Sequence, residues 1–200
     1  VFLCSCSSKI DKNFQMKIGF GSCLHQDKSM AIFDAIKKEN FDLFLMIGDN
    51  VYGDSEEEDL DELKSAYEIQ RQNFEMMNFK FPFEAIWDDH DYGMNDAGVE
   101  YPYKEKSKDL FLKFWDVPSD DIRRFREGLY FDLIKDINNK KLQIIFLDTR
   151  TFRDSLKPSD SVGEPGKERY IPNPDKSLTI LGNEQWSWFK EKISQKVDFR

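Results

Sequence analysis

The chain has 200 residues, of which 40% are hydrophobic and 34% charged. This is the composition of one globular domain, and it excludes a disordered or collagen-like chain. The formal net charge of −9 argues against a nucleic-acid-binding surface, which needs a basic footprint. With only two histidines, the chain cannot build a zinc site from several imidazoles. It contains no run of about 20 apolar residues, so no membrane span is predicted.

The first eight residues read Val-Phe-Leu-Cys-Ser-Cys-Ser-Ser, with no initiating methionine. Leu3, Ser5 and Cys6 resemble a bacterial lipobox, in which a small residue precedes a cysteine that becomes lipidated. We therefore predict that residues 1–14 are the remnant of a signal or lipoprotein tether anchored through Cys6. This places the protein in a bacterial cell envelope, periplasmic or extracellular. The alternative is a disordered start with incidental cysteines.

Three short apolar runs have the length of strands: Lys17–Phe20, Phe41–Ile47 and Phe83–Trp87. The second run is almost continuously apolar, as expected of a strand buried on both faces. Four stretches show the spacing of amphipathic helices: residues 29–40, 56–79, 105–115 and 184–196. Ser55 and Glu58 predict a capping box before the second helix, and Asn183 predicts the cap of the last one.

The second half of the chain contains a different pattern. Leu129–Ile134 and Lys141–Leu147 flank an Asn138-Asn139 turn and predict an antiparallel hairpin. Residues 151–177 are polar, rich in proline and without a clear period, which indicates a long loop with a functional or covering role. No internal repeat and no interdomain linker is apparent.

Polar residues of the metal-ligating type follow each of the three early strands. Cys23 follows the first, Asp49 the second, and Asp89 with His90 the third. Because ligands bind at the carboxyl ends of strands in open α/β sheets, we expect these residues to converge on one edge. Asp148 follows the later strand in the same way and is a fourth candidate.

The residue types in this set favour a metal site rich in oxygen. Asp49 and Tyr52 lie three residues apart, and a tyrosinate coordinates well when a strong Lewis acid such as Fe³⁺ displaces its proton. Cys23 could add a thiolate, although a lone cysteine is also commonly a buried core thiol. Such a donor set suits Ca²⁺, Mg²⁺, Mn²⁺ or Fe³⁺ better than Zn²⁺. Two such ions would hold a phosphate and generate a hydroxide to attack it.

Five segments occur in an order that resembles the PhoD-like (alkaline phosphatase D) metallophosphatases. They are Gly21-Ser22-Cys23, Gly48-Asp49-Asn50-Val51-Tyr52-Gly53-Asp54, Trp87-Asp88-Asp89-His90-Asp91-Tyr92-Gly93-x-Asn95-Asp96, Phe146-Leu147-Asp148-Thr149-Arg150 and Leu181-Gly182-x-Glu184-Gln185-Trp186. The resemblance covers residues from about 16 to 196. It implies the α/β fold of the calcineurin-like metallophosphoesterase superfamily, a sandwich of two β-sheets flanked by helices.

The resemblance also implies roles for individual residues. Asp49 would bridge two metal ions, Cys23 and Tyr52 would ligate iron, and Asp89 would ligate the second metal. His90 would contact the phosphate or protonate the leaving oxygen. The implied pair is Fe³⁺ and Ca²⁺, with Mn, Mg or Zn as alternatives. Arg150 could bind phosphate through its two-pronged guanidinium, or form a structural ion pair.

The family carries a later strand that ends in a Gly-Asp-x-His-type motif, and this sequence has no histidine after His90. We therefore expect residues 15–200 to be the N-terminal portion of a PhoD-like domain whose C-terminal part is missing. The expected function of the parent protein is hydrolysis of phosphate mono- or diesters by metal-bound hydroxide at a dinuclear site. This fragment is expected to be inactive.

A non-catalytic, cation-binding envelope protein that keeps the fold and part of the site is the alternative function. A Ser-His-Asp hydrolase is a weaker idea, because Ser22 does not lie in a Gly-x-Ser-x-Gly elbow. The acidic run from Asp54 to Glu62 lacks the alternating ligands of an EF-hand, so we interpret it as a solvated helix start. The expected partner is a phosphate-ester substrate, and the sequence does not indicate the oligomeric state.

Overall fold

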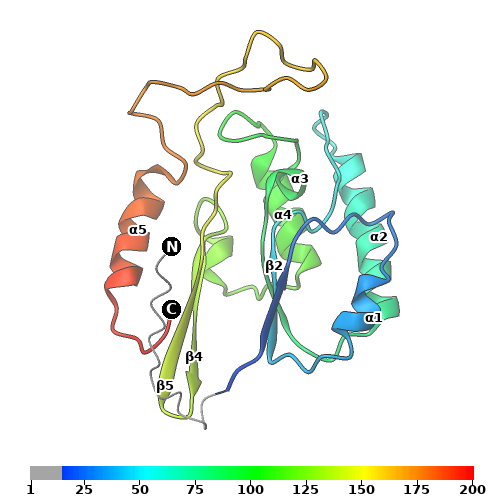
Figure 1. Cartoon of the computed structure of the whole chain (residues 1–200), viewed down its shortest axis with the longest axis vertical. Helices are drawn as coiled ribbons and strands as arrows, with labels where there is room; N and C mark the ends of the chain where they lie inside the picture. Colours follow the sequence, from blue (N-terminus) through cyan, green and yellow to red (C-terminus); the bar gives the residue numbers. More distant parts are fainter. Residues whose placement is uncertain (1–14) are drawn as a thin grey trace.

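The computed structural model describes residues 15–200, which form the mixed α/β arrangement of Figure 1. The predicted tether over residues 1–14, with the predicted lipidation site Cys6, lies outside the described residues. Within the described part of the chain, no helix is both long enough and apolar enough to cross a membrane.

A three-stranded parallel sheet forms the centre of the molecule, in the order β1-β2-β3. Its strands are β1 (Ile18–Gly21), β2 (Leu43–Ile47) and β3 (Phe83–Ile86). Along the middle strand, neighbouring Leu43 and Phe44 are both buried, whereas Leu45 is half-buried and Ile47 is 46% exposed. Since neighbours point to opposite faces, the prediction of burial on both faces is correct only for the start of β2.

The helices are α1 (Ile32–Ile36), α2 (Asp61–Met77), α3 (Asp89–Tyr92), α4 (Lys104–Phe114) and α5 (Gly182–Ser194), with a 3-10 turn η1 (Ile122–Arg124). The helix predicted over residues 29–40 is reduced to the five residues of α1. This segment buries only Phe33, so tertiary packing supplies little of the stabilisation that a short helix needs.

Two predicted helix caps are wrong. α2 begins after Leu60, and Ser55 lies outside the helix, where its hydroxyl accepts a hydrogen bond from Leu63 N (3.1 Å). Asn183 lies inside α5, and the hydroxyl of Thr179 accepts the N–H of Gly182 instead (3.1 Å). In both helices a side chain brought in by the preceding loop satisfies a free N–H of the first turn.

The predicted hairpin is confirmed as strands β4 (Phe131–Ile137) and β5 (Lys140–Phe146), which pair in antiparallel register. Asn138 and Asn139 both have positive φ angles, 48° and 65°. A two-residue turn of this kind matches the right-handed twist of its strands, and asparagine tolerates the left-handed region better than most residues.

Figure 1 shows the layers of the molecule: α1, α2 and α4 lie on one side of the parallel sheet, the hairpin lies on the other, and α5 lies beyond the hairpin. The predicted α/β class with two sheets and flanking helices is confirmed. The long predicted loop is also confirmed, because residues 151–177 contain only an isolated bridge between Pro158 and Tyr170. This loop (yellow to orange in Figure 1) arches over the end of the molecule where the three parallel strands finish.

Candidate metal centre

The carboxyl ends of the three parallel strands meet at one edge, as the sequence predicts. The loop after β1 is tied to the loop after β2 by Cys23 N to Gly48 O (3.3 Å) and Leu24 N to Asp49 O (2.7 Å). Gly48 has a φ angle of +112°, and a Cβ at this position would lie 2.6 Å from the Cβ of Asp88. Glycine therefore allows the loops after β2 and β3 to approach each other.

Asp49, Asp89 and His90 form a cluster whose potential ligand atoms lie within 4.8 Å of one another. Oδ2 of Asp49 accepts the hydroxyl of Tyr52 (3.1 Å) and lies 3.5 Å from the Sγ of Cys23. Oδ1 of Asp49 is buried and has no hydrogen-bond partner among the described residues. A buried carboxylate oxygen without a donor, next to a second carboxylate, is the environment that a cation would satisfy.

The two carboxyl groups of this cluster have opposite pKa shifts. Burial raises the pKa of Asp49, and the charges of Asp89 and Asp88 raise it further. Burial acts in the same direction on Asp89, but the N–H of Asp96 (2.7 Å) and the guanidinium of Arg150 hold its pKa below the usual value. In the metal-free protein, Asp49 is therefore the carboxyl that retains a proton more readily.

The ring of His90 is held by two neighbours. Its Nδ1 lies 2.7 Å from Oδ1 of Asp54, and its ring centroid lies 4.2 Å from that of Tyr52, which also stacks with His25 at 4.9 Å. Burial alone would lower the pKa of His90, but Asp54 and the cluster carboxylates raise it above the usual value. Because Nδ1 faces Asp54, Nε2 is the ring nitrogen that a ligand could contact.

Sequence reasoning missed two of these contacts. The sequence pattern places Asp54 in a solvated helix start, yet its Oδ1 contacts Nδ1 of His90. Its place five residues after Asp49 in the same motif was the available signal. Nothing in the sequence pattern singled out His25, because its contact with Tyr52 depends on the meeting of two separate loops.

The environments of Tyr52 and Cys23 bear on their predicted role as ligands. Burial raises the pKa of the Tyr52 phenol well above its usual value, and hydrogen bonding and charge from Cys23 and Asp49 add to this effect. The phenol therefore keeps its proton in the metal-free protein. Cys23 is an exposed free thiol, which argues against the alternative of a buried core cysteine.

Arg150 reaches the cluster from the loop after β5. Its Nε donates to Oδ1 of Asp88, and its Nη2 lies 3.8 Å from Oδ1 of Asp89. The sequence left open whether Arg150 binds phosphate or forms an ion pair. In this structure it forms the ion pair, at the edge of the Asp49–Asp89–His90 cluster, so the same guanidinium lies beside the candidate site.

Two nearby buried carboxylates already accept hydrogen bonds from other groups of the protein. Asp148, the fourth candidate from the sequence, is fully buried, and its oxygens accept the N–H groups of Leu129, Arg150 and Thr151 and the hydroxyl of Thr151. Asp91 is also fully buried, where burial raises its pKa to about 7 against the opposing effect of N–H groups that it accepts. Both carboxylates organise loops around the site.

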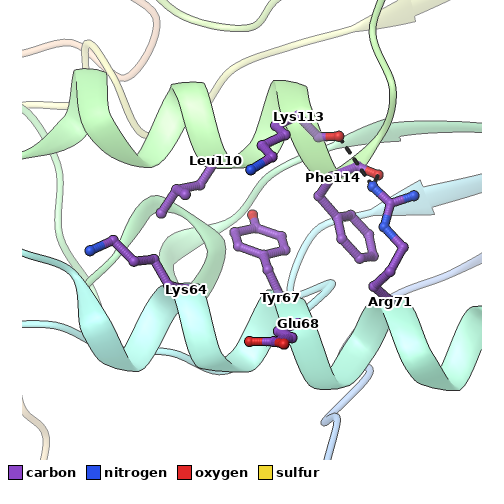
Figure 2. Close-up of a pocket in the computed structure, with 7 residues that line it drawn as sticks. All are labelled: Lys64, Tyr67, Glu68, Arg71, Leu110, Lys113 and Phe114. Carbon is purple, nitrogen blue, oxygen red and sulfur yellow. Dashed lines mark hydrogen bonds between the residues drawn. The ribbon is translucent and has the colours of Figure 1, made fainter.

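Figure 2 shows a groove of about 500 Å³ between α2 and α4, which shares none of its lining residues with the cluster. The side chain of Arg71 crosses one end of the groove and donates to the carbonyl groups of Lys113 and Phe114 and to Asp116. The guanidinium is thus satisfied by the protein. The groove is not part of the candidate metal centre.

No protein-family model matches the chain, and no curated protein matches it. A solved structure titled "Structure of PhoD" superposes on 89% of this chain with a TM-score of 0.56 and 20% sequence identity. The chain spans 39% of the length of that solved chain. The fold is therefore PhoD-like, and the metal-type cluster lies at the carboxyl ends of the parallel strands within this fold.

Proposed function

We propose that this chain carries part of the active site of a PhoD-like, metal-dependent phosphoesterase acting on phosphate mono- or diesters. The observation that supports the proposal most strongly is the Asp49–Asp89–His90 cluster, with one buried Asp49 oxygen that lacks a hydrogen-bond partner within residues 15–200. The PhoD-like fold supplies the second line of support.

The residues of the cluster fit a metal ion. Asp49 and Asp89 offer hard oxygen ligands, and the unpartnered Oδ1 of Asp49 is available for coordination. Tyr52 and Cys23 adjoin the other oxygen of Asp49, so a strongly Lewis-acidic ion such as Fe³⁺ could be held from that side. We propose Fe³⁺ with Ca²⁺ as the second ion. When bound, the metals supply Lewis acidity at the phosphoryl group and a nucleophile derived from water.

The remaining polar residues of the site have separate proposed roles. His90 donates a proton from Nε2 to the leaving oxygen, because Asp54 holds the opposite edge of the ring. Arg150 supplies positive charge beside Asp89 and can form two parallel hydrogen bonds with a phosphoryl group if it exchanges Asp88 for substrate. His90 and Arg150 are thus the proposed catalytic residues.

The test uses the full-length gene product, including any sequence that flanks residues 1–200, after removal of metal and reloading. Hydrolysis of p-nitrophenyl phosphate and bis-p-nitrophenyl phosphate is measured with Mn²⁺, Ca²⁺ and Fe³⁺, singly and in pairs. Asp49→Asn is compared with Asp109→Asn, which removes one exposed carboxylate from α4 and leaves the cluster intact. We expect metal-dependent turnover that Asp49→Asn abolishes and Asp109→Asn preserves.

Two results would contradict the proposal. Metal binding without turnover on either substrate would favour the non-catalytic cation-binding protein. Unchanged turnover in well-metallated Asp49→Asn would show that the cluster is not the active site. Isothermal titration with Mn²⁺ on the same samples separates these two outcomes, because it measures binding without requiring catalysis.

A further inference from the structure

Asp96 lies at the end of the long motif that begins at Trp87, and the proposed chemistry does not use it. It has a φ angle of +59°, in the left-handed region, and its backbone N–H donates to Oδ2 of Asp89 (2.7 Å). The main chain of Asp96 therefore holds one oxygen of a proposed metal ligand. This contact is also the largest of the effects that lower the pKa of Asp89 against the effect of burial.

The side chain of Asp96, in contrast to its backbone N–H, contacts the 151–177 loop. Its Oδ2 lies 2.6 Å from Nη1 of Arg169 and accepts the hydroxyl of Tyr170 (3.2 Å). Its backbone carbonyl accepts Nη2 of Arg153, at the beginning of the same loop. One residue thus contacts both a carboxylate of the metal cluster and two distant points of the 151–177 loop.

The first residues of the loop are bonded to the body of the molecule, with Arg153 O accepting Val99 N (2.9 Å) and Asp154 N donating to Thr179 O (3.0 Å), and among the described residues the remainder of the loop has few other connections. It pairs with itself through Ser159 N to Arg169 O (2.9 Å) and the Pro158–Tyr170 bridge, and most of its residues are exposed. Ser155 donates to Glu100 (3.1 Å) near its beginning. Because so few contacts hold the loop, the ties of Asp96 to Arg169 and Tyr170 are expected to contribute much to its position.

We propose that Asp96 is a positioning residue that couples the 151–177 loop to the Asp89 ligand. Its side chain holds the loop above the carboxyl ends of the strands, and its main chain orients the carboxylate. The loop, with Arg169 and Tyr170 at its attachment, then forms the wall that contacts the group beyond the phosphate of the substrate. This role in substrate contact rests on the proposed function, whereas the attachment itself does not.

Three variants separate the two contacts. Asp96→Asn removes the charge that holds Arg169, and asparagine tolerates the left-handed backbone, so the N–H to Asp89 is retained. Arg169→Gln removes the partner charge without touching the cluster. Glu58→Gln is the matched control, since it breaks a similar exposed ion pair with Lys106 (2.7 Å) on another part of the surface.

The first measurement is limited trypsin digestion of the full-length protein, with cleavage after Lys167 followed by mass spectrometry. We expect cleavage there to accelerate roughly two- to fivefold in Asp96→Asn and Arg169→Gln, the range for a half-exposed ion pair. Glu58→Gln should leave the rate unchanged. Equal rates in wild type and both loop variants would overturn the attachment.

The second measurement tests the coupling with Mn²⁺ as the probe. Mn²⁺ should slow loop cleavage in the wild type, and Asp96→Asn should lose most of this protection while binding Mn²⁺ within about twofold of the wild-type affinity. Protection that is absent in the wild type, or equal in both proteins, would overturn the coupling. If Mn²⁺ does not bind at all, the proposed function and the coupling both fail, and the metal-free digestion still decides the attachment.

The third measurement concerns the substrate. For Asp96→Asn and Arg169→Gln we expect KM for bis-p-nitrophenyl phosphate to rise with kcat unchanged, and KM for p-nitrophenyl phosphate to change less. A fall in kcat on both substrates with unchanged KM would contradict a positioning role through the loop.

Discussion

Replacing Asp49 with asparagine should stabilise the metal-free protein and remove its response to metal. In the folded protein, burial and the charges of Asp89 and Asp88 raise the pKa of Asp49. The folded state therefore holds this proton more tightly than the unfolded chain does. The contribution of Asp49 to the free energy of unfolding falls as the pH rises through the interval between the unfolded and folded pKa values. Asparagine removes the charge and accepts the left-handed φ of 49° at this position.

The magnitude follows from the separation of the two carboxylates. At the 4.8 Å limit of the cluster, two unit charges repel by about 3.5 kcal/mol at an effective dielectric constant of about 20. Solvent partly screens both groups, and Arg150 also holds Asp89. We therefore expect Asp49→Asn to raise the free energy of unfolding of the metal-free protein by only about 1–2 kcal/mol. For a chain of this size, that corresponds to a rise in Tm of roughly 2–8 °C.

The assay is urea unfolding of wild type, Asp49→Asn and Asp109→Asn, in EDTA and in Mn²⁺. In EDTA at pH 7.5, Asp49→Asn should be the most stable of the three, and its advantage should shrink when the pH is lowered toward 4. Mn²⁺ at about 100 times Kd should stabilise the wild type by about 2.7 kcal/mol and reverse the order. A less stable Asp49→Asn in EDTA, or equal stabilisation of wild type and Asp49→Asn by Mn²⁺, would refute the reasoning.

Three further predictions concern separate residues. His90→Ala should slow esters with poor leaving groups by about 10²–10⁴-fold and activated aryl phosphates much less, and equal losses on both would point to a role in binding. As-isolated protein should show a visible charge-transfer band if iron is bound by Tyr52 and Cys23, and Tyr52→Phe should shift or abolish it. Full activity without iron in a metal analysis would contradict that ligation. Expressed from the full-length gene, the protein should partition into detergent if Cys6 is lipidated, and Cys6→Ser should release it; a soluble form in both cases would contradict the anchor.

Local sequence determined the elements whose formation depends on neighbouring residues. The Asn138-Asn139 turn fixed the hairpin, because asparagine adopts the left-handed backbone that a two-residue turn requires. Apolar runs ending in polar residues located β1, β2 and β3 and predicted that Cys23, Asp49 and Asp89 would approach one another. Parallel strands bring their carboxyl ends to one edge, so this convergence required no knowledge of the loops.

Only the tertiary structure decided which polar residues are free to act. Asp148 and Asp49 follow apolar strands in the same way, yet backbone N–H groups and a hydroxyl donate to the oxygens of Asp148, while one oxygen of Asp49 has no hydrogen-bond partner in the described part of the chain. Asp54 acquires its role from His90, which lies 36 positions later in the sequence. Asp96 acquires its role from Arg169 and Tyr170, which lie 73 and 74 positions later. A carboxylate becomes a ligand, a structural acceptor or a positioning group according to the donors that surround it. Those donors come from distant loops, so the sequence alone determines the chemical types at the site and the tertiary structure determines their use.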